Sequence, residues 1–289
     1  MQVNVLLPAV TSLLGLGFAG MMLVRFRARR QPCYLAWGLG LVWYAVAAGT
    51  EALGGAQGWT VDLYRAWYIT GAIGVAAFLG AGSLYLHRTP AFGSLTVVWL
   101  LAGCAPALAG RHSLIGLLGL AAAGVVTAVL TWRPAWFAHA VFAVLVVASV
   151  LAAVEVLTAS VDPSLLPQSA EQVVSGQAFD AETRALTPPF NIPGALVLLS
   201  GAALSAVHFW RTRALPRRVA ANLFIAVGAF VPSLASGLTR YGITSVFFVG
   251  ELVGLICILA GFLLSGATSP PPSVRPSAPP QAPALPYTA

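Results

Sequence analysis

The sequence predicts an all-helical protein that crosses a membrane many times, and three observations lead to that prediction. Of its 289 residues, 58% are hydrophobic and only 8% are charged. A soluble domain carries about 25% charged residues, so this chain lacks the polar surface that keeps a protein in solution. The mean hydropathy is +0.86. Apolar runs of about 20 residues, the length that a spanning helix needs, recur along the chain.

Dividing the chain at its polar breaks predicts nine spans. A charge in hydrocarbon costs about 3 kcal/mol or more, so charged residues mark where most spans end. An arginine lies within two residues after the first, third, fourth, fifth, seventh and eighth runs, and a long polar loop precedes the seventh. The spans are residues 3–24, 33–52, 63–86, 93–109, 114–132, 136–159, 192–210, 219–238 and 244–265. Only a four-residue turn separates 93–109 from 114–132. If these two form a re-entrant hairpin, seven spans remain.

The arginines predict the orientation, because positive residues near span ends stay on the cytoplasmic side. Placing the first arginine cluster inside puts the N-terminus outside, the C-terminus in the cytoplasm, and all eight acidic residues outside or in the outer part of the membrane. Eleven arginines then face the cytoplasm and four face outward, as expected for a multi-pass protein of a plasma membrane. The cytoplasmic set is Arg25, Arg27, Arg29, Arg30, Arg88, Arg133, Arg211, Arg213, Arg217, Arg218 and Arg275.

Composition also excludes several classes of chemistry. The chain has no lysine, so it cannot form a Schiff base with retinal or with pyridoxal phosphate. Its three cysteines have no paired spacing, and its basic clusters are short turns suited to lipid headgroups rather than to nucleic acid. We found no sequence motif of a hydrolase, a metalloprotease or a nucleotide-binding protein. We therefore predict no cofactor and no enzymatic activity.

Two segments differ from the predicted bundle of residues 1–266. Residues 267–289 carry eight prolines and one charge, which predicts an extended cytoplasmic tail. The outer loop at 160–191 is longer than ordinary connections, which indicates a functional or partly structured segment. Ser169 with Gln172 fits a capping box, and Asp180 can cap a second short helix. The loop is then either a lid over a site or a packed cover over helix ends.

Residues 4–88 and 191–265 share a weak pattern that suggests an internal repeat. Each begins with an asparagine, crosses once, and turns through Arg-x-Arg-Ala at Arg25 and again at Arg211. Each crosses back, meets an outer arginine beside a tyrosine, and closes with a glycine-rich span. Parallel repeats of this kind occur in transporters, with sites at the interface between the repeats. A similar turn also arises if every cytoplasmic turn is simply rich in arginine.

Ionisable residues inside a membrane are functional candidates, because their insertion is costly. Five of them are predicted to meet in the outer half of the bundle. Glu251 is the deepest acid, about 10 Å below the outer end of its span. The cluster is either a site for an anion, a zwitterion or a proton, or a set of ion pairs that lock helices together. Its members are Glu51, Arg65, Glu155, Arg240 and Glu251.

The histidines are weaker candidates. His87, His139 and His208 lie toward the cytoplasmic ends of different spans, where they could ligate a metal or a haem. None has a second histidine or an acid at helical spacing, and no acid lies on that face to orient an imidazole. We therefore predict no metal site.

Residues 1–88 resemble the opening of the seven-helix membrane sensor regions found at the front of some bacterial histidine kinases. The likeness consists of one span, an arginine-rich turn, a second span ending in Glu51, and Arg65-Ala66-Trp67-Tyr68 at the start of a third. The chain as a whole resembles uncharacterised polytopic membrane proteins of GC-rich bacteria, which implies no activity. No functional residue is carried over from either resemblance.

Three functional hypotheses follow. The first is a non-enzymatic sensor or accessory protein that binds a small ligand or a protein partner at its outer face, with membrane lipids around it. The second is a transporter of small molecules or ions built on a parallel three-helix repeat. The third, an intramembrane metal or haem enzyme, requires the three histidines to converge.

Overall fold

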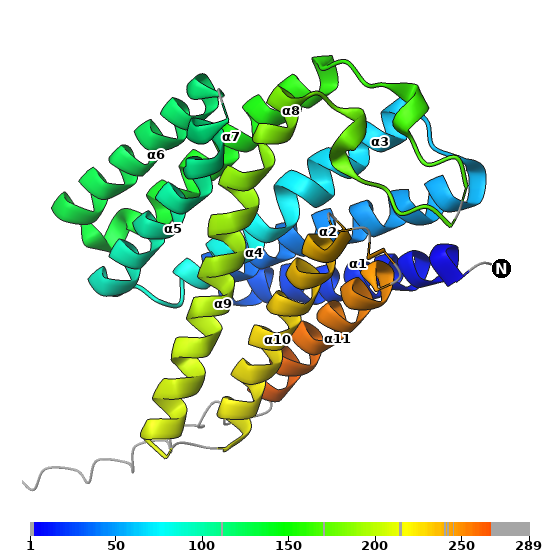
Figure 1. The fold of residues 1–289 in the computed structure, drawn as a ribbon. Helices are drawn as coiled ribbons and strands as arrows, with labels where there is room; N and C mark the ends of the chain where they lie inside the picture. The colour runs from blue at the N-terminus through cyan, green and yellow to red at the C-terminus, as the bar shows by residue number, and fades with distance from the viewer. Residues whose placement is uncertain are drawn as a thin grey trace, which may run out of the picture.

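The structure is a computed structural model that describes residues 3–110, 112–169, 171–213, 216–239, 241, 243–244 and 246–266. Within these residues, nine helical segments are long and apolar enough to cross a membrane, which confirms a multi-pass all-helical bundle. The predicted tail 267–289 lies outside the described residues. The spans, shown in Figure 1, are α1 Val3–Arg29, α2 Pro32–Gln57, α3 Val61–Trp67 with η1 Tyr68–Gly74 and α4 Val75–Leu84, α5 Pro90–Ala109, α6 Ser113–Trp132, α7 Phe137–Thr158, α8 Ala181–Ala185 with α9 Thr187–Arg211, α10 Pro216–Thr239 and α11 Phe247–Gly266.

Helices α5 and α6 resolve the choice between nine and seven spans. Each has 20 residues. At 1.5 Å per residue each is about 30 Å long, which equals the thickness of the hydrocarbon core. A re-entrant hairpin would need shorter helices, so the geometry fits two full spans. Helix α6 lies at the edge of the bundle, where it packs on α5 and α7 (Figure 1).

Six of the nine spans form a closed ring. Helix α1 packs on α2, α2 on α4, α4 on α9, α9 on α10, α10 on α11, and α11 returns to α1. The ring therefore joins the three spans of the first proposed repeat to the three spans of the second. Helices α5, α6 and α7 lie outside it and attach through α9 and α4 (Figure 1).

The two halves of the ring also share a feature of the turn that follows their first helix. Helix α1 is followed by Arg30 with φ 54°, and α9 is followed by Arg213 with φ 49°. These are the only non-glycine residues with positive φ in the described part of the chain. A proline then begins the next helix in each case, Pro32 in α2 and Pro216 in α10. Proline suits that position, because it has no N–H to leave unpaired.

The third span is interrupted by a wide turn that the sequence did not predict. Tyr68–Gly74 forms a π-helix between α3 and α4, a form that is rare and often found at functional sites. The hydroxyl of Thr70 donates to the Ala66 carbonyl at 2.7 Å within this stretch. The span thus has an upper and a lower half that follow different helical registers.

Glycines allow the two halves of the ring to approach closely where α4 crosses α9. A Cβ atom added to Gly80 would lie 2.4 Å from the carbonyl oxygen of Gly194. One added to Gly194 would lie 2.4 Å from the carbonyl oxygen of Ala76. Small residues at membrane helix contacts permit this backbone-to-backbone packing.

The outer loop forms a packed cover over α3 (Figure 1). Its chain pairs with itself at Val161 and Phe179, and Phe179 is only 3% exposed because it packs against two tyrosine rings of the third span. The hydroxyl of Tyr64 donates to the Ser175 carbonyl at 2.7 Å. These contacts fix the middle of the loop to the bundle. The remaining loop elements are two 3₁₀ turns, η3 Pro163–Leu165 and η4 Gly176–Ala178.

The two caps predicted in this loop had different outcomes. The Asp180 carboxylate accepts the Thr183 backbone N–H at 2.7 Å, which confirms the cap of α8. The capping box at Ser169 and Gln172 is wrong, because these residues form a turn and not a helix. The Gln172 side chain instead accepts the Gln168 backbone N–H at 2.7 Å, which closes the turn locally.

Candidate functional site

A cavity of about 620 Å³ lies inside the six-helix ring. Ligand pockets in proteins have volumes of about 300–1,000 Å³, so this cavity could hold a small molecule. Every helix of the ring contributes to its wall, and α5, α6 and α7 do not. The third helices of the two halves line it with the same spacing: Leu79, Ser83, Leu86 and His87 from the end of the third span, and Ile258, Phe262, Ser265 and Gly266 from α11.

The cavity is polar at one end and apolar at the other. The polar end coincides with the ends of α1 and α11 and the beginnings of α2 and α10, which the arginine distribution predicts to be cytoplasmic. Its polar lining includes Arg25, Arg29, Tyr34, Arg218, Asn222 and Ser265. The deep end is lined by Phe18, Leu41, Leu79, Leu198, Ile225 and Ile258.

Aromatic rings hold the arginines at the polar end. The guanidinium of Arg25 lies 4.2 Å from the ring centroid of Phe262, and that of Arg218 lies 5.4 Å from the ring centroid of Phe209. Arg29 donates a long hydrogen bond of 3.5 Å to the Tyr34 hydroxyl. Stacking of this kind orients a guanidinium but does not neutralise its charge.

A histidine also borders this end of the cavity. The Nε2 atom of His87 lies 3.3 Å from the Ser205 hydroxyl, across the contact between the third span and α9. Burial lowers the pKa of the His87 imidazole from its usual value, because the charged form loses its hydration. A neutral His87 can accept or donate a hydrogen bond without adding to the positive charge of the arginines.

Two acids lie beyond the apolar end of the cavity, toward the predicted outer side. Glu51 of α2 is 3% exposed, and its carboxyl group lies beside that of Glu251 in α11. Two negative charges side by side in a buried site repel each other, so a pair that holds one proton is less costly than a doubly charged pair. Trp67 donates its Nε1–H to Glu51 Oε1 at 2.8 Å. Beside the pair, the Tyr44 hydroxyl donates to the Glu251 backbone carbonyl at 2.9 Å.

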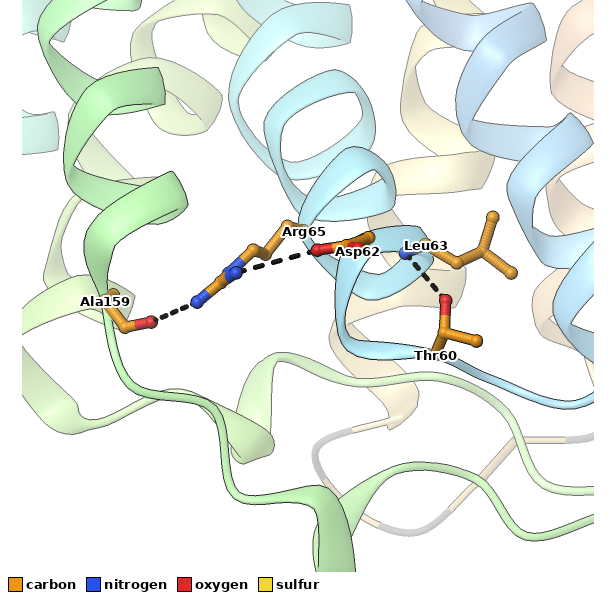
Figure 2. Close-up of polar contacts among 5 residues, drawn as sticks. All are labelled: Thr60, Asp62, Leu63, Arg65 and Ala159. Atoms are coloured by element: carbon orange, nitrogen blue, oxygen red, sulfur yellow. Dashed lines mark hydrogen bonds and ion pairs between the residues drawn. The ribbon is translucent and has the colours of Figure 1, made fainter.

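The structure places two of the other predicted members, Arg65 and Glu155, away from this pair. Arg65 donates to the Ala159 carbonyl at 2.9 Å, at the end of α7, and lies 3.7 Å from Asp62 (Figure 2). It therefore caps a helix end. Glu155 is exposed on α7, close to the same end. Arg240 lies outside the described residues.

The three histidines of the metal hypothesis do not all meet at one place. His139 contacts the Tyr85 hydroxyl at 3.3 Å, while His87 and His208 line a second, smaller pocket between the start of α5 and α9. In the described part of the chain, no group of three or more His, Cys, Asp or Glu side chains lies together in a way that could hold a metal ion. The hypothesis of an intramembrane metal or haem enzyme therefore gains no support from these histidines.

Sequence reasoning missed the cavity, because it treated the cytoplasmic arginines as orientation signals alone. One signal was present: Arg25 and Arg29 are four residues apart on one face, in register with Phe18 and Met22. No protein-family model, curated protein or solved structure with which the chain was compared matches it.

Proposed function

We propose that the protein is a membrane transporter built from two parallel three-helix units, with its substrate cavity between them. The observation that carries the proposal is the cavity itself, which is walled by all six helices of the two units and by none of the other three spans. Sites at the interface between repeats are typical of transporters, because rocking of one unit against the other can expose such a site to each side in turn.

The carboxyl pair supports the proposal by its position. Glu251 lies seven residues before Ile258 on α11, or about 10 Å beyond the apolar end of the cavity. The pair joins α2 of the first unit to α11 of the second. A contact between the units on the outer side, with an open polar end on the other, is the arrangement that an inward-facing transporter requires.

The location proposed for this transporter is the bacterial plasma membrane, with the polar end of the cavity in the cytoplasm. The orientation rests on the arginines, which lie at the cavity's polar end and at the adjoining turns. A transporter needs binding and conformational change but no bond chemistry, in line with the prediction that the protein is not an enzyme.

The sensor or accessory-protein hypothesis stays a second proposal. Its ligand or partner would bind at the outer face, where the loop covers α3. Phe179, Val174 and Leu166 of this loop are buried against the bundle. A fixed cover of this kind suits a surface that a partner recognises, whereas a lid would need to open.

Cysteine accessibility separates the two proposals without knowledge of the substrate. In a background in which the three native cysteines are replaced by alanine, Ser83→Cys places a thiol in the cavity wall, and Thr50→Cys places one in α2 at the residue before Glu51. Both positions are buried, at 5% and 7% exposure. A transporter should let an impermeant maleimide reach Ser83→Cys from the cytoplasmic side and Thr50→Cys from the outside. Leu13→Cys on the lipid-facing side of α1, where Leu13 is 70% exposed, is the unlabelled control.

Two exposed positions check the sidedness of the vesicles. Ser164→Cys in the outer loop should react only from outside, and Arg217→Cys at the start of α10 only from the cytoplasm. If Thr50→Cys reacts no faster than Leu13→Cys while these controls behave as expected, the outer half does not open. That result would overturn the transporter and favour the sensor.

A further inference from the structure

The arginines in the cavity have no acidic partner among the residues that the structure describes. The described residues contain one ion pair, between Arg65 and Asp62, at the other end of the bundle. All eight acidic residues of the sequence lie in the outer half of the bundle or beyond it. The guanidinium groups of Arg25, Arg29 and Arg218 are therefore available to bind an anion from outside the chain.

The cavity has room for more than a small anion. Along α1 its lining extends from Arg29 to Phe18, eleven residues or about 16 Å of helix. Beyond the arginines the wall consists of aliphatic and aromatic side chains, which favour an apolar occupant over water. A phosphate or sulfate ion would satisfy the arginines and leave that part unfilled. A neutral hydrocarbon would fill it and leave the arginines without an anion.

We propose that the cavity binds an amphipathic anion, with a carboxylate or phosphate headgroup against Arg25 and Arg218 and an apolar chain running toward Leu41 and Ile258. This names the substrate class of the transporter and so rests on the proposed function. The two guanidinium groups come from different units, α1 of the first and α10 of the second. A single headgroup between them would link the units at their cytoplasmic ends, because arginine binds carboxylate and phosphate through paired N–H donors.

Trp37 offers a direct reporter of occupancy. Its ring lines the cavity, and its Nε1–H donates to the Leu79 carbonyl at 3.2 Å, which fixes its position. In the full-length protein in phosphatidylcholine nanodiscs, dodecanoate brominated on its chain should quench tryptophan fluorescence saturably. Trp37→Phe should remove most of that quenching. The comparison probes are the equally brominated dodecyltrimethylammonium, and inorganic phosphate as a competitor.

The arginines and the apolar wall are tested by separate variants. Arg25→Gln and Arg218→Gln should each weaken dodecanoate binding by about tenfold or more, because each removes charge-assisted hydrogen bonds. Arg217→Gln, one residue along on the exposed side of α10, should change binding less than twofold. Ala202→Phe, which fills the cavity from α9 without adding a tryptophan, should abolish quenching while leaving the arginines in place.

The outcomes distinguish the ligand class, its source and the proposed function. Equal quenching by the cationic probe, or equal affinity for the Arg25→Gln and wild-type proteins, would overturn the amphipathic anion. So would full competition by inorganic phosphate at the concentration of dodecanoate. If phosphatidylglycerol in the nanodisc displaces dodecanoate, the anion is a membrane lipid. If it does not, the anion is a free amphiphile. If dodecanoate binds but Thr50→Cys does not react from outside, the ligand class stands and the transporter is overturned. If Thr50→Cys reacts but dodecanoate does not bind, only the ligand class is overturned.

Discussion

Replacing Trp67 by phenylalanine measures whether the buried carboxyl pair carries charge. The substitution removes the N–H that Glu51 Oε1 accepts at 2.8 Å and keeps a ring that can stack on Tyr64, whose centroid lies 5.6 Å away. Hydrogen bonds to charged groups contribute about 1.5–3 kcal/mol, and neutral ones about 0.5–1.5 kcal/mol. Two carboxyl groups that share one proton hold one negative charge. We therefore expect Trp67→Phe to lower the free energy of unfolding by about 1.5–3 kcal/mol.

The assay is unfolding by sodium dodecyl sulfate in mixed micelles, followed by circular dichroism. Trp59→Phe is the matched control, because Trp59 packs against the same Tyr64 and Trp67 rings and, within the described residues, does not donate to a carboxyl group. It should cost clearly less. In a Glu51→Gln background the cost of Trp67→Phe should fall to the neutral range of about 0.5–1.5 kcal/mol. Equal costs for the two tryptophans, or no change in the Gln background, would refute a charged pair.

Three further predictions concern a helix contact, a buried histidine and a helix cap. Gly80→Ala should lower the free energy of unfolding by about 1–3 kcal/mol, the usual cost of overpacking, because its Cβ meets the Gly194 backbone. Gly17→Ala in α1, where nothing lies within 4 Å of the added Cβ, is the control in the same unfolding assay. Because burial lowers the pKa of His87, the unfolded chain takes up a proton first, so stability should fall as pH drops below about 6.5 and level off below the folded pKa. His87→Gln should flatten this part of a stability–pH curve, and an unchanged slope would contradict it. Asp180→Ala should cost about 0.5–2 kcal/mol by loss of its cap, seen as faster proteolysis of the outer loop.

The spans could be predicted from the sequence because each depends only on its own residues. Hydrocarbon accepts a run of about 20 apolar residues whatever its neighbours are, and α1 to α11 follow those runs closely. The same locality explains the successful cap at Asp180, whose partner is three residues away. The capping box at Ser169 failed because a turn offered Gln172 a competing local hydrogen bond.

The site was less predictable because it depends on which helices become neighbours. Depth alone placed Glu51 and Glu251 together, and the structure agrees for that pair. The expected membrane depth also suggested that Arg65 lies near them. Its side chain instead donates to the end of α7, and the sequence of α3 alone does not show that α7 is its neighbour. The cavity needs six helices to meet, and nothing in a single span encodes that ring.

The π-helical turn determines how the two halves of the third span are rotated relative to each other. Above the turn, Trp67 faces the carboxyl pair, and below it Leu79 and Ser83 face the cavity. A π-helical turn holds more residues than an α-helical turn, and these extra residues set the rotation of one face relative to the other. Deleting one residue between 68 and 74 would shorten the span very little. It would rotate one half against the other. The helix would keep nearly its full length, but Trp67 and the cavity-lining residues would no longer be aligned with the carboxyl pair and the cavity.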